Sequence, residues 1–395
     1  MLIKREIEGQ IRDAATQFPV IAIIGPRQSG KTTLAQMVFP DHKYISLEDF
    51  DVRELALADP RRFLAEYPTS SGIILDEIQN APVLLSYMQT IVDREKKKGF
   101  FIVTGSQNIL VHEAISQTLA GRIALLTLLP LSMSELEGAQ LLPEKIETVV
   151  WKGLYPQIYN ENIPSSRLYA NYILTYVERD VRQMRQIADL ETFQRFIRLC
   201  AGRIGQVVNL ESLGNDCGVN HSTVKAWLSV LEASYIVFSL YPYYKNFGRR
   251  LVKSPKIYFV DTGLACSLLN IKSDEELMSH YLRGGLVESF IISDIRKQRY
   301  NQDQQPNVYF WRDHGGNEID CIIDQAYPIP VEIKAGKTVA TDFFKAFDEW
   351  QELTQSSKKQ YYVIYGGAET QQWPKATVLG WKSAGSIIKK IEEEK

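Results

Sequence analysis

One segment of the chain has the residue types and spacing of a phosphate-binding loop. Residues 25–32 read G-x-x-x-x-G-K-T between an apolar run and a helix-forming run. The glycines let backbone N–H groups wrap a β-phosphate, Lys31 neutralises the β and γ charge, and the Thr32 hydroxyl is a magnesium ligand. A glycine turn with a surface lysine is the alternative, which the flanking segments disfavour. The predicted ATP-binding residues here are Gly25, Pro26, Arg27, Gln28, Ser29, Gly30, Lys31, Thr32 and Thr33.

An acidic pair follows 45 positions after Lys31. The apolar strand expected over 72–75 delivers Asp76 and Glu77 at its carboxyl end, where open α/β sheets bind ligands. We expect Asp76 to hold Mg²⁺ through water and Glu77 to orient or deprotonate the attacking water. A simple acidic cap of the strand is the alternative, but its order after the phosphate loop favours hydrolysis over nucleotide binding alone.

Polar side chains near the next two strands are candidates for sensing the γ-phosphate. Thr104, Ser106 and Gln107 end one apolar strand and could touch that phosphate or hold the attacking water, although ordinary turn polarity explains them equally well. Arg122 ends a helical run just before the following strand. It could satisfy the helix end, or it could be an arginine finger that reaches the γ-phosphate of a neighbouring subunit. The finger role requires an oligomer.

A second group of acids lies in the last third of the chain. Glu288 stands on an expected helix, Asp320 lies in a strand, and Glu332 and Lys334 alternate along the next strand, so they share a face. Pairing the two strands as a hairpin brings Asp320 beside Glu332. We expect Asp320 and Glu332 to hold Mg²⁺, Lys334 to orient water and Glu288 to complete the acidic shell for phosphodiester hydrolysis. The pattern resembles PD-(D/E)xK nucleases, with Ile319 in place of the proline; exposed strand-end charges, or a binding module, are the alternatives.

Positive charge gathers between these two groups. Residues 167–256 hold 13 Lys and Arg against 7 Asp and Glu, a net charge of +6 in a chain of net charge -2. A helix, a turn at Gly218, a second helix and two apolar strands form a winged-helix pattern there. Such units also bind proteins, which is the alternative to DNA. The predicted DNA contacts are His221, Thr223 and Lys225 at the start of the second helix, and Arg249, Arg250 and Lys253 in the wing.

The elements that must position these residues fall into four expected units. Residues 1–135 alternate apolar runs with helical stretches, which predicts a mostly parallel sheet with helices on both faces. Residues 136–204 are helical and predict a lid or connector. Residues 205–265 hold the winged helix. Residues 280–395 open with an expected amphipathic helix over 285–298 and continue as a second α/β domain.

Several motifs resemble those of one family. The strings GPRQSGKTTL, ISLED, IILDEIQ, TGSQ, LAGR, PLSMSEL and GLYP are similar to those of prokaryotic AAA-type ATPases, of the archaeal-ATPase kind, that carry an uncharacterised C-terminal domain. The strings YFVDTGLACSLL, GGLVESFIISDI and VEIKAG extend the resemblance over nearly the whole chain. It implies a P-loop ATPase core with a helical lid, a winged helix and a restriction-endonuclease-like domain. Arg179 and Arg182 are candidates for a second sensor arginine in the lid.

Composition limits the class of protein. With 395 residues, 45% hydrophobic and 23% charged, the chain is long enough for several folded domains. Four dispersed cysteines, no signal peptide and no apolar run of bilayer length predict a cytoplasmic protein that has no membrane partner. The favoured hypothesis is an oligomeric, Mg²⁺-dependent ATPase that engages DNA and cuts or grips it. The rival is a nucleotide-driven switch or scaffold that binds proteins and has an inactive nuclease-like domain.

Overall fold

The first sheet of the computed structural model is fully parallel. The structure describes residues 2–67, 72–106, 118–176, 189–243, 254–313, 315–354 and 360–393. The strands are β1 (Val20–Ile24), β2 (Lys43–Ser46), β3 (Ile73–Asp76), β4 (Phe101–Gly105) and β5 (Ile123–Thr127), in the order β2-β3-β4-β1-β5. Each pair runs parallel. The sheet and its parallel strands, both predicted from the alternating sequence pattern, are confirmed.

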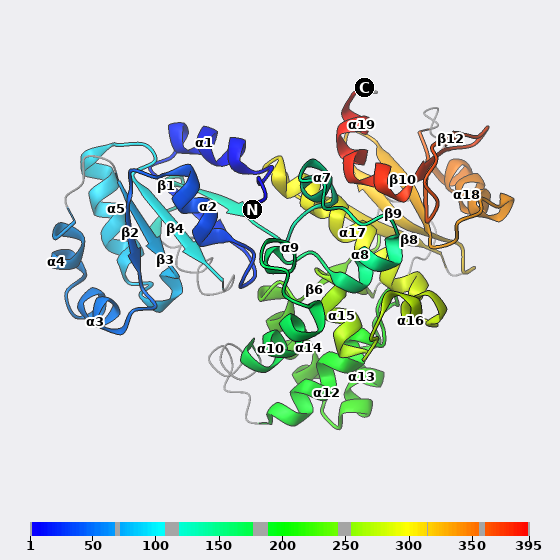
Figure 1. Ribbon diagram of the computed structural model, residues 1–395, viewed down its shortest axis with the longest axis horizontal. Helices are drawn as coiled ribbons and strands as arrows, with labels where there is room; N and C mark the ends of the chain where they lie inside the picture. Colours follow the sequence, from blue (N-terminus) through cyan, green and yellow to red (C-terminus); the bar gives the residue numbers. More distant parts are fainter. Residues whose placement is uncertain are drawn as a thin grey trace.

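Helices cover both faces of this sheet (Figure 1). Along β1 every residue is buried, because alternate side chains enter opposite cores. One core holds Ile21 and Ile23 and is covered by α1 (Glu8–Gln17) and α2 (Lys31–Val38). The other core lies under α3 (Phe50–Ala58), α4 (Pro60–Ala65) and α5 (Leu84–Glu95). The carboxyl ends of the strands are therefore open to a ligand.

A helical region follows, as the sequence predicts. Its helices are α7 (Met133–Gly138), α8 (Ile146–Lys152), α9 (Pro156–Asn160), α10 (Ser165–Tyr176) and α12 (Leu190–Ala201). Ser132 and Glu135 form a reciprocal capping box that starts α7. Within the described residues of 136–204 there is no strand. Arg179 and Arg182 lie outside the described residues.

Two helices and a small antiparallel sheet come next. The helices are α13 (Leu210–Cys217) and α14 (His221–Ala233), and the strands are β6 (Val237–Leu240) and β7 (Lys256–Phe259). Asn209 and Asn220 cap the two helices with their side-chain oxygens. Gly218 ends α13 with a φ of 76°, a left-handed conformation that glycine adopts without strain. Two short helices follow, α15 (Thr262–Leu268) and α16 (Asp274–Ser279).

A second, mixed sheet forms the C-terminal part. Its strands are β8 (Val308–Arg312), β9 (Glu318–Asp324), β10 (Pro328–Lys334), β11 (Tyr362–Tyr365), β12 (Gln371–Gln372) and β13 (Thr377–Gly380), in the order β12-β13-β11-β10-β9-β8. The helical elements are α17 (Arg283–Asn301), η3 (Thr341–Phe344), α18 (Lys345–Thr354), η4 (Trp381–Ser386) and α19 (Ile387–Glu393). The hairpin of β9 with β10 is antiparallel. Strands β12 and β13 were not predicted.

The small antiparallel sheet is joined to the C-terminal sheet. Just after β6, the amide of Tyr243 donates to the carbonyl of Phe310 on β8 at 2.7 Å. The amide of Phe310 donates back to the carbonyl of Tyr241 at 3.1 Å. These bonds bring β7 close to the face of the sheet where the predicted acids lie.

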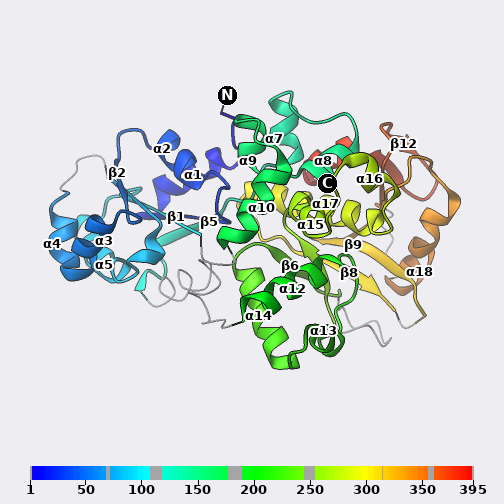
Figure 2. The ribbon, with the colours of Figure 1, turned by 60° about the horizontal axis from the view of Figure 1, so that its bottom comes forward.

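The long helix α17 differs from its prediction. An amphipathic helix was expected over 285–298, but α17 is buried on almost every side, and it runs through the middle of the molecule (Figures 1 and 2). Its polar side chains are paired instead of exposed. Ser293 donates to a carbonyl just after β7 at 2.6 Å, Lys297 to one just before α7 at 3.0 Å, and Gln298 to one in η4 at 2.8 Å. The helix therefore ties all parts of the chain together.

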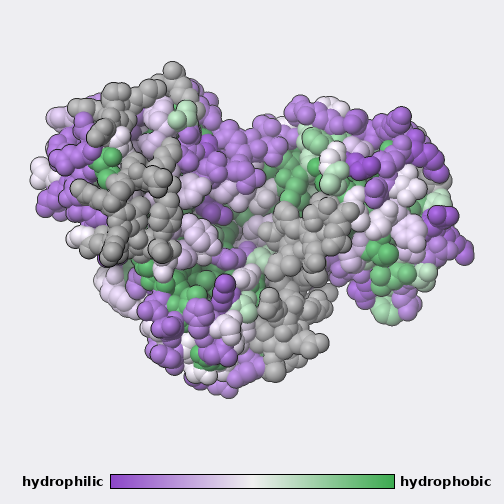
Figure 3. All heavy atoms as spheres, turned by 180° about the vertical axis from the view of Figure 1, so that it is seen from behind, coloured by the Kyte–Doolittle hydropathy of each residue, from purple (hydrophilic) through white to green (hydrophobic). Residues whose placement is uncertain are grey.

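Among the described residues, no helix is both long and apolar enough to cross a membrane. On the face in Figure 3, hydrophilic residues predominate and apolar residues gather in small patches. The four cysteines, Cys200, Cys217, Cys266 and Cys321, are buried and free.

Candidate functional sites

The phosphate-loop segment joins β1 to the N-terminus of α2. Gly30 is the N-cap of α2 with a φ of 92°, a region that favours glycine. A Cβ on Gly25 would stand 2.0 Å from the carbonyl oxygen of Leu128, so only glycine fits there. Lys31 is buried at 4% exposure and donates to the carbonyl of Pro26 at 2.8 Å. The loop thus presents backbone N–H groups at the positive end of a helix.

A cavity of about 420 Å³ lies over this loop. Six of the predicted ATP-binding residues line it: Gln28, Ser29, Gly30, Lys31, Thr32 and Thr33. Other parts of the wall come from Glu77, from Leu2, Ile3 and Arg5 of the N-terminal segment, and from the helix α9. Gly25, Pro26 and Arg27 are not among the lining residues within the described chain and shape the turn behind it.

Arg5 fixes the loop from outside, which sequence reasoning missed. Its guanidinium donates to the carbonyls of Ser29 and Leu129, both at 2.7 Å, and to the Glu135 carboxylate at 2.9 Å. Arg5 is only 8% exposed. No local motif predicts this role of Arg5, because its three partners lie 24 to 130 positions away in the sequence.

The structure brings the two predicted magnesium residues into contact. The Thr32 hydroxyl donates to Asp76 Oδ1 at 2.8 Å, and the Tyr44 hydroxyl donates to Asp76 Oδ2 at 3.0 Å. The Thr104 hydroxyl also donates to Asp76. Burial and the Asp76 charge raise the pKa of Tyr44 to about 12. Because Mg²⁺ prefers carboxylate and hydroxyl oxygens in proteins, the donor set fits a magnesium ion bound together with ATP.

Glu77 is held in a defined pose at the mouth of the sheet. Its φ of 57° is unusual for a residue other than glycine, and its amide donates to the Thr104 hydroxyl at 3.1 Å. Glu77 Oε2 accepts a hydrogen bond from the Ser106 hydroxyl at 3.0 Å and a second from Gln79 Nε2 in η1 (Ile78–Asn80). Sequence reasoning named Ser106 but missed Gln79. Gln107 lies outside the described residues.

Arg122 lies at the end of the sheet opposite to the phosphate loop. Val20 and Ile123 pair at the amino ends of β1 and β5, whereas the loop follows Ile24 at the carboxyl end of β1. Five residues of strand separate the two ends by roughly 17 Å. The Arg122 guanidinium binds the Asp93 carboxylate at 2.6 and 3.0 Å. Arg122 therefore cannot reach a γ-phosphate bound in its own chain.

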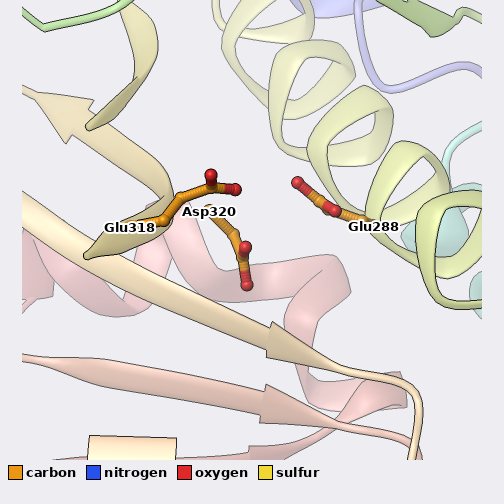
Figure 4. Close-up of side chains that lie close together, drawn as sticks. All are labelled: Glu288, Glu318 and Asp320. Atoms are coloured by element: carbon orange, nitrogen blue, oxygen red, sulfur yellow. The ribbon is translucent and has the colours of Figure 1, made fainter. Parts of the chain in front are cut away.

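Four carboxylates, here called the acidic cluster, meet between α17, β9 and β10: Glu288, Glu318, Asp320 and Glu332. In Figure 4, Glu288 points from the helix toward Glu318 and Asp320 on the strand. One oxygen from each of these three residues lies within 4.8 Å of the other two. The register that pairs Val331 with Cys321 sets Glu332 beside Asp320. The structure thus brings together the three predicted acids, Glu288, Asp320 and Glu332, and adds Glu318.

Lys334 completes the arrangement on β10. Its ammonium lies 2.6 Å from Glu332 Oε1 and 3.5 Å from Asp320 Oδ2, and the amide of Ile333 donates to the same Asp320 oxygen at 2.8 Å. Burial alone would lower the pKa of Lys334, but Asp320 and Glu332 outweigh it and raise that pKa. Glu332 Oε2 is buried and has no hydrogen-bond partner among the described residues. An orphaned carboxylate oxygen beside Asp320 fits a cation ligand.

Three members of this site were not predicted: Lys256, Tyr258 and Glu318. Lys256 on β7 is 2% exposed, and its ammonium binds Glu288 at 2.9 Å and also binds Glu318. Tyr258, on the same strand, donates its hydroxyl to Glu288. Glu318 stands two residues before Asp320, so strand alternation could have found it. Nothing local marks Lys256, which comes from a different sheet.

Two glutamates of the acidic cluster, Glu288 and Glu332, are hard to ionise. Burial, together with the Asp320 charge, raises the pKa of Glu288 to about 7 and that of Glu332 to about 8. The lysines beside them act in the opposite direction and are outweighed. Glu288 and Glu332 therefore take up a proton more readily than ordinary glutamates.

The predicted DNA-contact residues divide into two groups. His221 and Lys225 are exposed on the first turns of α14, and Thr223 is partly exposed beside them. Trp227 and Leu228 on the same helix are buried, at 8% and 7% exposure. The wing residues Arg249, Arg250 and Lys253 lie outside the described residues.

Comparison with known proteins gives the class of the N-terminal part. Residues 17–137 match a family model described as an AAA domain. The phosphate loop, the parallel sheet and the Thr32–Asp76 contact agree with it, so this part of the chain is an AAA-type ATPase domain. Residues 143–275 and 283–383 match two further models, each described only as a domain of unknown function.

Two relatives of similar sequence are themselves described as uncharacterized, so they assign no activity to this chain. An uncharacterized protein of Mycobacterium tuberculosis is 29% identical over 344 residues, 86% of this chain and 75% of that protein. An uncharacterized protein of Methanocaldococcus jannaschii is 22% identical over 400 residues, 88% of this chain and 81% of that protein.

Two solved structures are similar to part of this chain, both at low TM-score and low sequence identity. The Walker-type ATPase of Pyrococcus abyssi has a TM-score of 0.46 and 14% identity, and the match covers 67% of this chain and 95% of that one. The RuvB Holliday junction branch migration motor of Thermotoga maritima has a TM-score of 0.30 and 17% identity, over 59% and 87% of the two chains. Because these TM-scores are low, the AAA assignment rests on the family model and on the site.

Proposed function

We propose that the protein is a Mg²⁺-dependent ATP hydrolase that works as an oligomer, engages DNA through α13 and α14, and cuts that DNA at the acidic cluster. The observation that carries the first part is the hydrogen-bonded network of Thr32, Asp76, Thr104 and Glu77 at the open edge of the parallel sheet. ATP turnover with and without DNA tests the ATP hydrolysis and the engagement of DNA together.

In the proposed hydrolysis, Glu77 takes a proton from water while the water oxygen attacks the γ-phosphorus. The bond from that phosphorus to the bridging oxygen breaks, and ADP and phosphate leave. Mg²⁺, held by Thr32 and through water by Asp76, would supply charge neutralisation on the phosphates. Ser106 and Gln79 keep the Glu77 carboxylate in place, and Lys31 balances the charge of the β and γ phosphates.

We propose the oligomer because Arg122 lies too far from the phosphate loop of its own chain. As an arginine finger it would reach only the γ-phosphate of a neighbouring subunit. Arg122→Ala should bind ATP normally and lose turnover, since a finger stabilises only the transition state. Mixing this variant with Glu77→Gln should restore part of the hydrolysis, because hybrid interfaces then combine an intact Glu77 with an intact Arg122. Asp93→Ala, which removes only the ion pair, should keep its turnover. A monomer whose specific turnover does not depend on protein concentration would contradict the oligomer.

DNA engagement is proposed from the helix pair and its small sheet, the arrangement of a winged helix. The exposed start of α14 would meet base edges, with His221, Thr223 and Lys225 at the contact. The wing residues would bind phosphates. Concentration of positive charge in this part of the chain supports the proposal, because phosphate contacts dominate DNA affinity.

The wing gives a quantitative expectation. Replacing Arg249, Arg250 and Lys253 together with Ala should weaken binding to every DNA sequence and reduce the slope of log affinity against log salt by about one unit for each phosphate that is no longer bound. As a control, residues 96–98, three exposed lysines just after α5, are replaced with Ala. This change removes the same charge and should leave the slope unchanged. Equal slopes for both triple variants in a salt titration would move the DNA interface elsewhere.

Cleavage is proposed because Asp320, Glu332 and Lys334 converge. A divalent metal held by Asp320 and Glu332, with Glu288 close by, would supply activation of water and neutralisation of the scissile phosphate. Lys334 would orient the attacking water. The water oxygen would attack the phosphorus and its proton would pass to solvent. The bond from phosphorus to one sugar oxygen would break, and that oxygen would take a proton from solvent. The domain would then be nuclease-like, of the PD-(D/E)xK kind.

A further inference from the structure

Lys256 is a buried cation that comes from outside the C-terminal sheet. It begins β7, pairs with Leu240 of β6, and sends its ammonium into the acidic cluster. Its side chain is 3% exposed, so water cannot replace the carboxylates around it. Removing a lysine from water is costly unless it is paired, and here two carboxylates bind it directly.

Lys256 binds oxygens of two of the three carboxylates that lie close enough together to hold a divalent ion. Glu288 and Glu318 belong, with Asp320, to the three carboxylates whose oxygens lie within 4.8 Å of one another. Lys256 binds the first two of them. An ammonium and a metal ion cannot share the same oxygens at contact distance, because both are positive and the site is desolvated.

The charge of the cluster leaves room for a stronger cation than lysine. The carboxylates contact Lys256, Lys334 and, at 3.3 Å from Glu318, Arg312. Four acids face three bases, so full ionisation, which the raised pKa values of Glu288 and Glu332 oppose, would leave one negative charge unbalanced and would require a further cation. The orphaned oxygen of Glu332, in a residue 7% exposed, stands beside Asp320 at this same place. A divalent ion would supply the missing charge and a partner for that oxygen.

We propose that the ammonium of Lys256 and a divalent cation compete for the acidic cluster, so that Lys256 keeps the metal out while β7 stays in the position seen here. This inference rests on the metal site proposed above and adds its regulation. Glu318 becomes a metal ligand once Lys256 leaves. Because β7 pairs with β6, which follows α14, a partner that shifts the helix pair would also withdraw the lysine.

Metal binding by the full-length protein tests the competition. Every variant carries Asp76→Asn, which removes the carboxylate of the nucleotide site, and Mn²⁺ binding is measured by the decrease of its free electron paramagnetic resonance signal. Lys256→Gln keeps a hydrogen-bond donor but removes the charge, and it should bind Mn²⁺ at least ~10-fold more tightly than the parent. Lys256→Arg keeps the charge and should bind like the parent. Adding Glu318→Gln to Lys256→Gln should abolish the gain.

The outcomes separate this inference from the metal site itself. If the parent and Lys256→Gln bind Mn²⁺ equally tightly, the site exists and the competition is wrong. If neither binds while both show cooperative melting, the proposed metal site is wrong as well. If Lys256→Gln is unfolded in the absence of metal, its melting transition should reappear when Mn²⁺ is added. A variant that stays unfolded with Mn²⁺ counts against the inference.

Discussion

Glu77→Gln should retain ATP and hydrolyse it at least ~100-fold more slowly, because the variant keeps the shape of the site and loses the base. Glutamine can still accept hydrogen bonds from Ser106 and Gln79 through its remaining carbonyl oxygen, so the local structure should persist. Steady-state phosphate release measures the turnover, and a fluorescent ATP analogue measures the binding.

Lys31→Ala gives the matched control for binding. It removes the cation that balances the β and γ phosphates, so ATP affinity itself should fall. Glu77→Gln and Lys31→Ala should therefore fail at different steps. Normal steady-state hydrolysis by Glu77→Gln would remove Glu77 from the role of base.

Asp320→Ala and Lys334→Ala should each abolish DNA cleavage and leave ATP hydrolysis unchanged, since neither residue contacts the nucleotide cavity. The parent protein with Mg²⁺ or Mn²⁺ is expected to nick or cut DNA. Loss of a metal ligand removes the ion and its activated water, and loss of Lys334 leaves that water unoriented. Relaxation of a supercoiled plasmid measures the nicking.

Contamination by another nuclease is excluded only when both variants, purified in the same way, show no DNA cleavage. Glu349→Ala on α18, which removes a hydrogen-bond partner of Asn317 outside the acidic cluster, is a suitable control and should cut normally. Cutting by Asp320→Ala at the parental rate would end the cleavage proposal, and the domain would then be better described as a binding module.

Local patterns were enough to predict the parts that depend on neighbours in sequence. The phosphate loop, the acids that end β3 and the hairpin that sets Asp320 beside Glu332 follow from strand alternation and motif order. Their geometry is decided within one or two elements. The register of β9 with β10 fixes both side chains on the same face.

The residues that were missed come from distant elements. Arg5 reaches the phosphate loop from the N-terminal segment, and Lys256 reaches the acidic cluster from another sheet. Tertiary contacts of this kind leave no periodicity in the sequence. The error about α17 has the same origin, because a helix with polar residues on several sides looks solvent-exposed until partners such as the carbonyl bound by Lys297 are known.

The central claim is that ATP hydrolysis by the AAA-type domain is coupled to DNA. The most direct test is steady-state ATP turnover by the parent protein with Mg²⁺, alone and with single- or double-stranded DNA, with Glu77→Gln as the background control. Turnover is expected to rise severalfold with at least one form of DNA, and alanines at Arg249, Arg250 and Lys253 should cancel the rise. ATP turnover that is the same without DNA, with single-stranded DNA and with double-stranded DNA would contradict the account.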